Sequence, residues 1–414
     1  MKILLTSHGS TGDIYPIIAL GKALLKNGHI VRFSCAPLFK DEIEQAGITF
    51  LHLPPDWKQE VFTECMRELD RQPNVLRLLR QIYRSGLPFM GELIDRMDRY
   101  IAGHDLVIGS YVFPHIGVLA EKHQVPFAVV VFSHNVVPSK SNAPEFVPKL
   151  RAFPKWIRER WNRLAWCMVS GIIDMTVNRV IHPVLREKNL PKMKHFLLKP
   201  ADLCIVAVSR ELMKGVCVSE RFKTVGYLRN QTAYDPEIEK ELDAFCQGEK
   251  VSILNFGSVS FDHIEGVMSR FEKYWEKGKK IILQSGWAGL SLKSFGNEFK
   301  TIGKMSHNQL FRRASVVIHH GGAGTTAAVF HAGKPQIVVP HFGDQYFWAS
   351  EVCRRSCGLS VPQKNWPELL PEAVSKIQKQ KKYLQNAESF AAILAKENGP
   401  ACAAKIIEDY VAHR

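Results

Sequence analysis

The sequence predicts an α/β fold made of two tandem domains, each with a parallel, doubly wound sheet. The chain has 414 residues, which is more than a single compact core usually holds. Short β-branched runs alternate with helical segments, as in parallel sheets. This alternation pauses in a polar stretch, Arg229–Glu249, and then restarts. We therefore place one domain at residues 1–229 and a second at 230–414, and we allow the last helix to return to the first domain.

The first domain alternates strands and helices from its first residues. Strands are expected at Lys2–Ser7, His29–Ala36, Thr49–Leu53, Leu106–Ser110, Phe127–Ser133, Leu203–Ser209 and Thr224–Leu228. Helices are expected at Ile14–Lys26, Phe39–Ala46, residues 57–102 with a break near Ser85–Pro88, and Pro114–His123.

The second domain repeats the alternation. Strands are expected at Val251–Phe256, Lys280–Gln284, Val316–His319 and Gln336–Pro340. Helices are expected at Asp262–Lys277, Gln309–Arg313, Thr325–His331, Tyr346–Arg355, Leu369–Lys396 and Pro400–Ala412. In such sheets ligands bind beyond the carboxyl ends of the strands.

Composition indicates a soluble globular protein, with 46% hydrophobic and 23% charged residues. No apolar run reaches the ~18–20 residues that span a bilayer. The N-terminal residues are typical of a strand followed by a glycine turn and not of a signal peptide. Nine scattered cysteines without a Cys-x-x-Cys pair favour reduced thiols in the cytoplasm.

A net charge of +15 is concentrated in residues 141–200, which hold twelve Lys or Arg and four Asp or Glu. Within this region Phe153–Met168 predicts an amphipathic helix with Ile157, Trp161, Leu164 and Met168 on one stripe. Basic charge with tryptophans is consistent with peripheral contact at the inner membrane surface. The alternative, which the sequence favours, is that the stripe packs on the domain core. No nucleic-acid-binding signature accompanies the charge.

The segment Val316–Ala328 carries the most informative motif. A buried strand ends in His319 and His320, a glycine-rich turn follows, and a helix then begins near Thr325. Backbone N–H groups and the positive end of the helix dipole bind phosphate at such a turn. Glycines alone would also serve an ordinary tight turn. The two histidines and the threonines favour a phosphate site.

A second motif follows at Gln336–Gln345. Here a buried strand runs into a loop that presents Asp344 and Gln345. The carboxylate and the amide suit the hydroxyl groups of a sugar. An ordinary polar loop would be the better interpretation if the motif stood alone, but it follows the phosphate turn closely.

These motifs resemble the UDP-glycosyltransferase superfamily, most closely its sterol and glycopeptide-aglycone branches. The resemblance rests on His319–Thr326 and on Gly343-Asp344-Gln345 some twenty residues later. Further elements agree from end to end of the chain. They are Gly9–Pro16, Phe256-Gly257-Ser258, Ser285-Gly286-Trp287 and Lys304–Leu310. Residues 141–200 match nothing in the family pattern.

The resemblance implies the two-Rossmann-domain fold called GT-B, with its sheets facing across a cleft. It implies that the first domain binds the acceptor and the second binds the nucleotide-sugar. His320, Gly322, Gly324 and Thr325 would bind the diphosphate, and Ser258 would reach it from the other side. Asp344 and Gln345 would hold the hexose. Trp287 would line the base pocket unless it is a core aromatic, and His319 would be structural.

Asp13 is the expected catalytic base, because the branches that the chain resembles place an acidic base at this point. A carboxylate is adequate for a proton that transfers late in bond formation. The structural alternative is a helix cap, since Asp is a preferred cap and a helix begins here. Other branches use His with a partner Asp after a later strand, but here that strand ends in Ser110. Asp13 would therefore act alone.

Two departures refine the expected activity. The family's ribose-binding Glu corresponds to Ala328, and no Asp-x-Asp triplet occurs in the chain. The missing triplet favours a reaction without metal, in which the helix dipole and His320 stabilise the leaving group. We therefore expect an inverting, metal-independent transfer of a hexose from a UDP- or TDP-sugar to a hydroxyl of a hydrophobic acceptor, with no other cofactor. A nucleotide-sugar epimerase and a non-catalytic nucleotide-sugar-binding protein are the alternatives.

Overall fold

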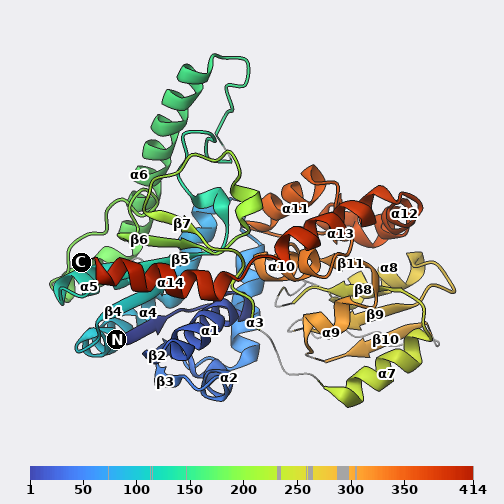
Figure 1. Ribbon diagram of the computed structural model, residues 1–414, viewed down its shortest axis with the longest axis horizontal. Coiled ribbons are helices and arrows are strands. Elements are labelled where there is room, and N and C mark those ends of the chain that lie inside the picture. The colour runs from blue at the N-terminus through green and yellow to red at the C-terminus, as the bar shows by residue number, and fades with distance from the viewer. Residues whose placement is uncertain are drawn as a thin grey trace. The chain divides into compact units, whose positions relative to one another are not determined.

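The computed structural model describes residues 1–72, 74–111, 113, 115–145, 147–230, 235–257, 259, 264–286, 298–303 and 305–413. The chain forms two compact units (Figure 1). Unit 1 contains Met1–Lys58, Gln72–Asn230 and Glu397–Arg414, and unit 2 contains Gln59–Arg71 and Gln231–Lys396. The chain therefore leaves unit 1 twice and returns to it twice.

Unit 1 is built on a seven-stranded sheet in the order β3-β2-β1-β4-β5-β6-β7, with every pair of neighbours parallel. The strands are β1 (Lys2–Thr6), β2 (Ile30–Cys35), β3 (Thr49–His52), β4 (Leu106–Ser110), β5 (Phe127–Val131), β6 (Leu203–Val206) and β7 (Phe222–Thr224). The central strands β4 and β5 are buried along their whole length, as expected for a parallel sheet covered on both faces.

Helices surround this sheet. They are α1 (Thr11–Lys26), α2 (Lys40–Gln45), α4 (Val75–Ile101), α5 (His115–Lys122), α6 (Lys155–Glu187) and α14 (Gly399–Ala412), with single turns η1 (Pro37–Phe39), η2 (His134–Val136) and η3 (Arg210–Met213). The helices of unit 1 lie between the strands in the order that the sequence predicts. The helix break expected near Ser85–Pro88 is wrong, because α4 runs through Pro88. Tyr83 and Met90 are buried on either side of the proline and hold both halves in the core.

The break in residues 57–102 lies instead between α3 (Gln59–Asp70) and α4. Asn74 is the N-cap of α4, and its side chain accepts a hydrogen bond from the Arg77 N–H at 3.0 Å. The cap satisfies a backbone donor that the first turn leaves unpaired. α3 packs within unit 2, although it precedes most of unit 1 in sequence.

Unit 2 is built on a six-stranded parallel sheet in the order β10-β9-β8-β11-β12-β13. The strands are β8 (Val251–Asn255), β9 (Ile281–Gln284), β10 (Phe299–Ile302), β11 (Ala314–His319), β12 (Gln336–Val338) and β13 (Gly358–Ser360). The sequence did not predict the edge strands β10 and β13. Both are short, and neither carries a continuous buried apolar run.

The helices of unit 2 are α3, α7 (Pro236–Cys246), α8 (Ile264–Tyr274), α9 (His307–Phe311), α10 (Ala323–His331), α11 (Gln345–Arg354), α12 (Trp366–Lys379) and α13 (Lys382–Leu394), with a turn η4 (Gln363–Asn365). The expected linker Arg229–Glu249 therefore contains a helix. α7 is fixed to the domain by the buried Glu239, which pairs with the buried Arg313 at 2.5 Å.

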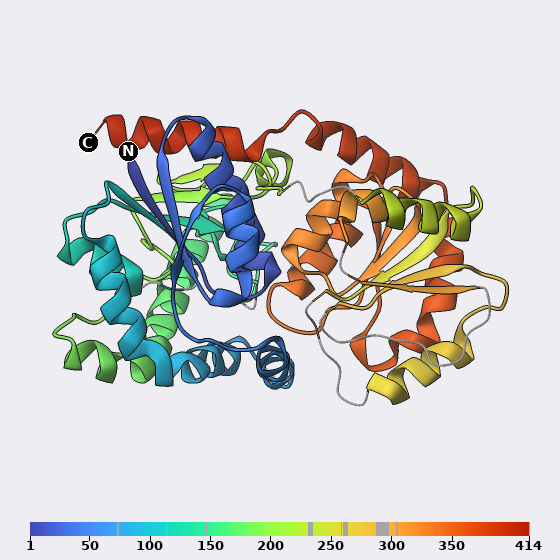
Figure 2. The same cartoon turned by 90° about the horizontal axis from the view of Figure 1, so that it is seen from below.

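α14 returns to unit 1 and packs along α1 (Figure 2). Glu397 anchors the returning chain by accepting hydrogen bonds from the Ser209 hydroxyl and the Arg210 N–H, both at 2.9 Å. At the other end of the helix, Glu408 contacts Asn27 and His29, each at 2.8 Å. Polar contacts at both ends thus hold the helix in register on α1.

α6 is longer than the predicted helix and extends away from the seven-stranded sheet (Figure 1). The expected packing of its apolar stripe on the core is wrong. Leu164 is 53% exposed and Met168 is 44% exposed. The buried face consists instead of residues such as Ala165, Val169 and Ile173. Among the described residues, α6 alone is long and apolar enough to span a bilayer by length and composition.

The strand orders indicate where each sheet is expected to bind a ligand. In unit 1 the order reverses direction between β1 and β4, and in unit 2 it reverses between β8 and β11. Such switch points open a crevice at the carboxyl ends of the strands. Asp13 follows β1, and His320 follows β11. Each unit therefore places one of the predicted motifs at its own switch point.

Candidate functional site

The turn between β11 and α10 requires glycine for steric reasons. Gly321 has a φ of 93°, and a Cβ atom there would lie 2.7 Å from Val338 Cγ1. At Gly322 a Cβ atom would lie 2.4 Å from His320 Nε2. Side chains would therefore clash with the strand beside the turn or with the histidine.

The amino end of α10 offers unsatisfied backbone donors. Gly322 is the N-cap, and no side chain caps the helix. The first N–H groups of a helix have no partner within the helix, and the positive end of its dipole attracts anions. Gly324 is exposed and open, with no atom within 4 Å of a Cβ added there, so a ligand can reach the backbone. The predicted phosphate residues Gly322, Gly324 and Thr325 thus lie together in one turn of helix.

His319 has a structural role, as the sequence analysis expected. Its ring is fully buried, its Nε2 lies 2.8 Å from Gln336 Oε1, and its Nδ1 accepts from the Gly321 N–H at 3.0 Å. Burial lowers the pKa of His319 to about 4. The neutral ring therefore ties the turn to β12.

His320 carries a buried ring nitrogen without a hydrogen-bond partner among the described residues. The residue is only 8% exposed, and the nitrogen is Nδ1. Burial, and then the neighbouring His319, His341 and His307, lower the pKa of His320 well below 6.5. A neutral imidazole carries one N–H donor. A buried ring with an unpartnered nitrogen beside a helix amino end is suited to donate to an anion.

Loops after β8 and β9 complete this edge of the sheet. Asn255, the last residue of β8, donates to Gln284 Oε1 at 2.7 Å, and its Oδ1 accepts from the Gly257 N–H at 2.9 Å. The two loops touch, because a Cβ atom on Gly286 would lie 2.2 Å from the Gly257 carbonyl oxygen. Ser258 and Trp287, the predicted donor-binding residues that follow these glycines, lie outside the described residues.

Asp344 and Gln345 begin α11. Asp344 is half-buried and accepts a hydrogen bond from Trp348 Nε1 at 3.1 Å. Gln345 is buried, and its Oε1 accepts from the N–H groups of His341 and Phe342 at 2.8 and 3.3 Å. The oxygen of Gln345 therefore shapes the loop.

A polar cluster beside this loop was not predicted. Gln363 Nε2 lies 3.0 Å from Asp70 Oδ2 and 2.7 Å from His341 Nδ1, and His341 Nδ1 lies 3.4 Å from Asp70 Oδ1. Asp70 comes from α3, far from the loop in sequence. No sequence signal could have found it, because only the packing of α3 within unit 2 brings it there.

In unit 1, Asp13 occupies the third position of α1. Ser10 is the N-cap, and Asp13 Oδ2 accepts from the Ser10 N–H at 2.8 Å and from the Ser10 hydroxyl at 3.3 Å. The Ser10 side chain in turn accepts from the Asp13 backbone N–H, which makes the pair a capping box. The structural alternative named Asp13 as the helix cap. The N-cap is instead Ser10. Asp13 is half-buried, so one carboxylate can both support the helix and face a substrate.

Two histidines beside the β1–β4 switch point, the half-buried His8 and the buried His115, were also missed. The His8 and Phe113 rings lie 5.0 Å apart, and those of Phe113 and His115 lie 5.9 Å apart. His8 Nε2 and both ring nitrogens of His115 lack hydrogen-bond partners among the described residues. Burial lowers the pKa of His8 to about 4 and that of His115 to about 3. His8 lies five residues before Asp13 in sequence. This proximity was the one signal in the sequence that could have placed His8 near the site.

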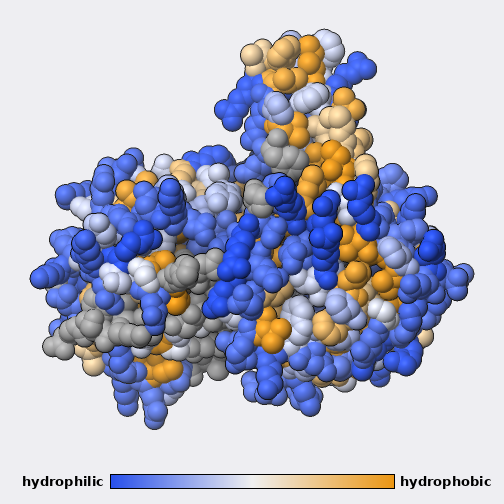
Figure 3. All heavy atoms as spheres, turned by 180° about the vertical axis from the view of Figure 1, so that it is seen from behind, coloured by the Kyte–Doolittle hydropathy of each residue, from blue (hydrophilic) through white to orange (hydrophobic). Residues whose placement is uncertain are grey.

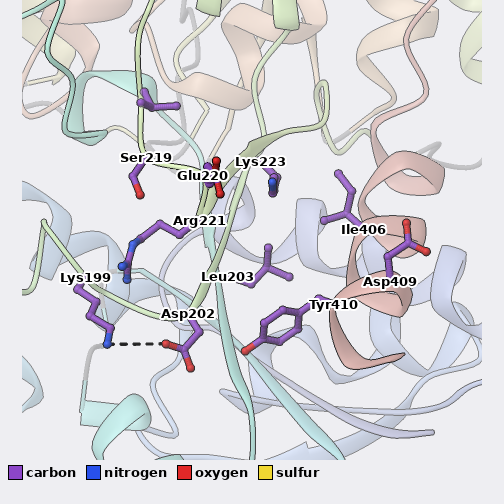
Figure 4. Close-up of a pocket in the computed structure, with 11 residues that line it drawn as sticks. Lys199, Asp202, Leu203, Ser219, Glu220, Arg221, Lys223, Ile406, Asp409 and Tyr410 are labelled. Atoms are coloured by element: carbon purple, nitrogen blue, oxygen red, sulfur yellow. Dashed lines mark ion pairs between the residues drawn. The ribbon is translucent and has the colours of Figure 1, made fainter. Parts of the chain in front are cut away.

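A cavity of about 980 Å³ in unit 1 lies elsewhere (Figure 4). It is lined by residues that precede β6 and β7 and by α14, among them Lys199, Asp202 and Tyr410. It therefore opens at the amino ends of these strands, opposite to the edge where such sheets bind ligands. Among the described residues, no group of three His, Cys, Asp or Glu could hold a metal ion.

Comparisons with known proteins agree with this geometry at both ends of the chain. Residues 3–137 match the glycosyltransferase family 28 N-terminal domain. Residues 279–410 match the erythromycin biosynthesis protein CIII-like C-terminal domain. The first match contains Asp13, and the second contains His320 and Asp344.

Two relatives and one solved structure illustrate the likeness. A sterol 3-beta-glucosyltransferase of Pichia angusta is 26% identical over 96% of this chain, which spans only 32% of that protein. An O-mycaminosyltylonolide 6-deoxyallosyltransferase of Streptomyces fradiae is 26% identical over 86% of this chain and 84% of its own length. The glycosyltransferase VinC, solved in complex with DTDP, has a TM-score of 0.68 at 13% identity and covers 100% of both chains.

The solved structure shows that the fold is that of two-domain glycosyltransferases, and the sequence matches cover the residues of both motifs. The two family matches and the relatives together support the UDP-glycosyltransferase superfamily and an enzyme of the transferase class.

Proposed function

We propose that the protein transfers a hexose from a UDP- or TDP-sugar to a hydroxyl of a hydrophobic acceptor, with inversion and without a metal. The observation that carries the proposal is the uncapped amino end of α10 beside the buried, unpartnered His320 nitrogen. This arrangement offers several donors to one anionic group. The DTDP bound to VinC supports a nucleoside diphosphate as that group.

The diphosphate would bind at α10 through the N–H groups of Gly324 and Thr325 and the N–H of His320. These donors are fixed before the substrate arrives, so they need no reorganisation as charge develops on the leaving oxygen. The positive end of the α10 dipole acts in the same direction. The neutral state of His320 suits a donor that must not bind the product too tightly.

The hexose would lie against the start of α11. Asp344 supplies carboxylate oxygens and Gln345 supplies its Nε2 group, since its Oε1 is held by two backbone N–H groups. A carboxylate accepts from sugar hydroxyls and an amide donates to them. Together they would select a sugar by the direction of its hydroxyls.

Asp13 would act as the base. The acceptor oxygen forms a bond to the anomeric carbon as the bond from that carbon to the diphosphate oxygen breaks. The acceptor proton passes to the Asp13 carboxylate, and the nucleoside diphosphate leaves with the bonding electron pair. Attack from the side opposite to the leaving group inverts the anomeric centre.

The acceptor would bind at the carboxyl edge of the unit 1 sheet. His8 and Phe113 are half-buried there and their rings pack against each other, with the buried His115 next to Phe113, so the acceptor would lie against the His8 and Phe113 rings. The named acceptors of relatives, a sterol and a tylonolide, support a hydrophobic alcohol.

The test is release of nucleoside diphosphate from UDP-glucose and TDP-glucose in the presence of sterols, macrolide aglycones and phenols. We expect release that depends on an acceptor and is unchanged by EDTA. Isomerised donor without acceptor would indicate the epimerase. Thermal stabilisation by donor without turnover of any acceptor would indicate a binding protein. Loss of activity in EDTA that Mg²⁺ restores would overturn metal independence.

Replacing His320 with Ala should weaken donor binding about 10- to 100-fold, because a hydrogen bond to a charged group contributes roughly 1.5–3 kcal/mol. Calorimetric titration with UDP or TDP measures the Kd. His320→Gln keeps an N–H donor and should recover part of the affinity. An unchanged Kd in His320→Ala would remove the histidine from the site.

A further inference from the structure

The outer face of α6 and the loop before it form an apolar surface that no described part of the chain covers. Its members are exposed residues that recur along one side of the helix and at its start. They are Phe153, Trp156, Leu164, Met168, Ile172 and Met175. Trp156 and Met175 are each 62% exposed. We refer to these six residues as the α6 stripe. Hydrophobic side chains gather on this projecting part of unit 1 in Figure 3.

The opposite face of α6 is fixed to unit 1 by polar contacts. Asn162 Nδ2 donates to the Lys140 carbonyl, and Trp166 Nε1 donates to the Asn142 carbonyl, both at 2.8 Å. Farther along, the Asp174 carboxylate accepts from the His195 and Phe196 N–H groups at 2.7 and 2.9 Å. These contacts set the orientation of the helix, and the α6 stripe therefore points away from unit 1.

Basic residues surround the first half of the stripe. Residues 149–163 hold six Lys or Arg and one Glu, a net charge of +5. Arg158, Arg160 and Arg163 are exposed, and Lys155 is 83% exposed at its side chain. Apolar side chains with a Trp, next to a dense positive charge, are typical of helices that lie in the interface of an anionic membrane.

We propose that the α6 stripe docks unit 1 on the surface of an anionic lipid bilayer, with α6 lying in the plane of the interface. The stripe enters the boundary between headgroups and acyl chains, and the arginines contact lipid phosphates.

Two other occupants are disfavoured by the same residues. A bilayer-spanning α6 would have to break the Asp174 contacts and place a carboxylate in hydrocarbon, which is costly. A second copy of the chain would bring two +5 segments together, and like charges in contact oppose association. An anionic lipid surface complements both the charge and the apolar stripe.

The test is flotation of the full-length protein with phosphatidylcholine vesicles that contain phosphatidylglycerol, compared with pure phosphatidylcholine. We expect binding to the anionic vesicles at low salt that weakens as salt is raised. Leu164→Glu with Met168→Glu, and separately Arg160→Glu with Arg163→Glu, should each reduce the partition coefficient by at least about tenfold. None of these residues belongs to the proposed sugar-transfer site. A loss of vesicle binding in these variants therefore tests the membrane proposal, whereas turnover tests the proposed function.

Matched control variants lie in unit 2. Leu384 is 41% exposed and Lys379 is exposed, so Leu384→Glu with Lys379→Glu adds negative charge without touching the stripe. This variant should float like the wild type. Vesicles should also shift Trp emission to the blue, and Trp156→Phe should reduce that shift.

Equal flotation of the stripe variants and the wild type would overturn the proposal. A wild-type dimer that ignores vesicles and becomes a monomer in Leu164→Glu with Met168→Glu would also overturn it, in favour of a second copy. The mass of the free protein in solution, measured for the wild type and this variant, gives that result.

Discussion

Replacing Asp13 with Asn should lower kcat for sugar transfer by about 10²- to 10⁴-fold, the usual contribution of a general base. In the proposed mechanism the Asp13 carboxylate takes the proton of the acceptor hydroxyl, which an amide cannot do. Binding of UDP or TDP should stay close to wild type, because the donor residues lie in unit 2. Steady-state kinetics with a reactive acceptor and calorimetric titration with the nucleotide measure the two effects.

The capping box makes a matched control necessary. Asn at position 13 keeps a side-chain oxygen that can accept from the Ser10 N–H, so the helix end is largely preserved. Ser10→Ala removes the cap and keeps the carboxylate, and we expect it to cost about 1 kcal/mol of stability with kcat within a few-fold of wild type. Asp13→Asn with normal turnover, or Ser10→Ala with an equal loss of kcat, would assign Asp13 a structural role only.

The protein should lose stability steeply as pH falls from 6.5 toward 4. His319 and His115 are both fully buried, and burial lowers their pKa values to about 4 and about 3. In the unfolded chain a histidine titrates near 6.5, so acid protonates the unfolded state first. Stability is therefore complete above pH 6.5 and is lost as the pH approaches the folded pKa. Each such residue contributes a loss of about 3 kcal/mol by pH 4.

Chemical denaturation at a series of pH values measures this dependence. His115→Leu replaces a ring whose nitrogens have no partner among the described residues, so the variant should fold and its slope should fall by about 1.4 kcal/mol per pH unit between pH 4 and 6. His413 is exposed, so His413→Leu serves as the control that leaves the buried histidines in place. Equal slopes in both variants would show that burial of His115 does not carry the effect.

The elements that frame the proposed donor site could be predicted from local sequence. A β-branched run marks β11, and the glycines that follow it are required by the backbone at Gly321 and by the His320 ring at Gly322. The start of α10 was placed near Thr325 and lies at Ala323, because no side-chain cap marks it. The roles of Asp344, Gln345, Ser258 and Trp287 stay predictions.

The missed features depend on tertiary packing. β10 and β13 are edge strands whose sequences, Phe-Lys-Thr-Ile and Gly-Leu-Ser, have no buried apolar run, since strand preference depends on the neighbours that a strand acquires. Asp70 reaches His341 only because α3 packs within unit 2. The outward orientation of the α6 stripe follows from polar contacts with residues around 140 and 195. The spacing of apolar residues along a helix does not reveal such contacts.

The return of α14 to α1 also sets an order for biosynthesis. Unit 2 emerges from the ribosome before α14 does, so unit 2 can fold while the apolar face of α1 still lacks its cover. At ~5–20 residues per second, the residues between β7 (ending at Thr224) and α14 (beginning at Gly399) take roughly 9 to 35 seconds to synthesise. During that interval the nascent chain contains a unit 1 that still lacks α14, joined to a unit 2 that can already fold. A chaperone that shields α1 at this stage would act on a surface that the native protein never exposes.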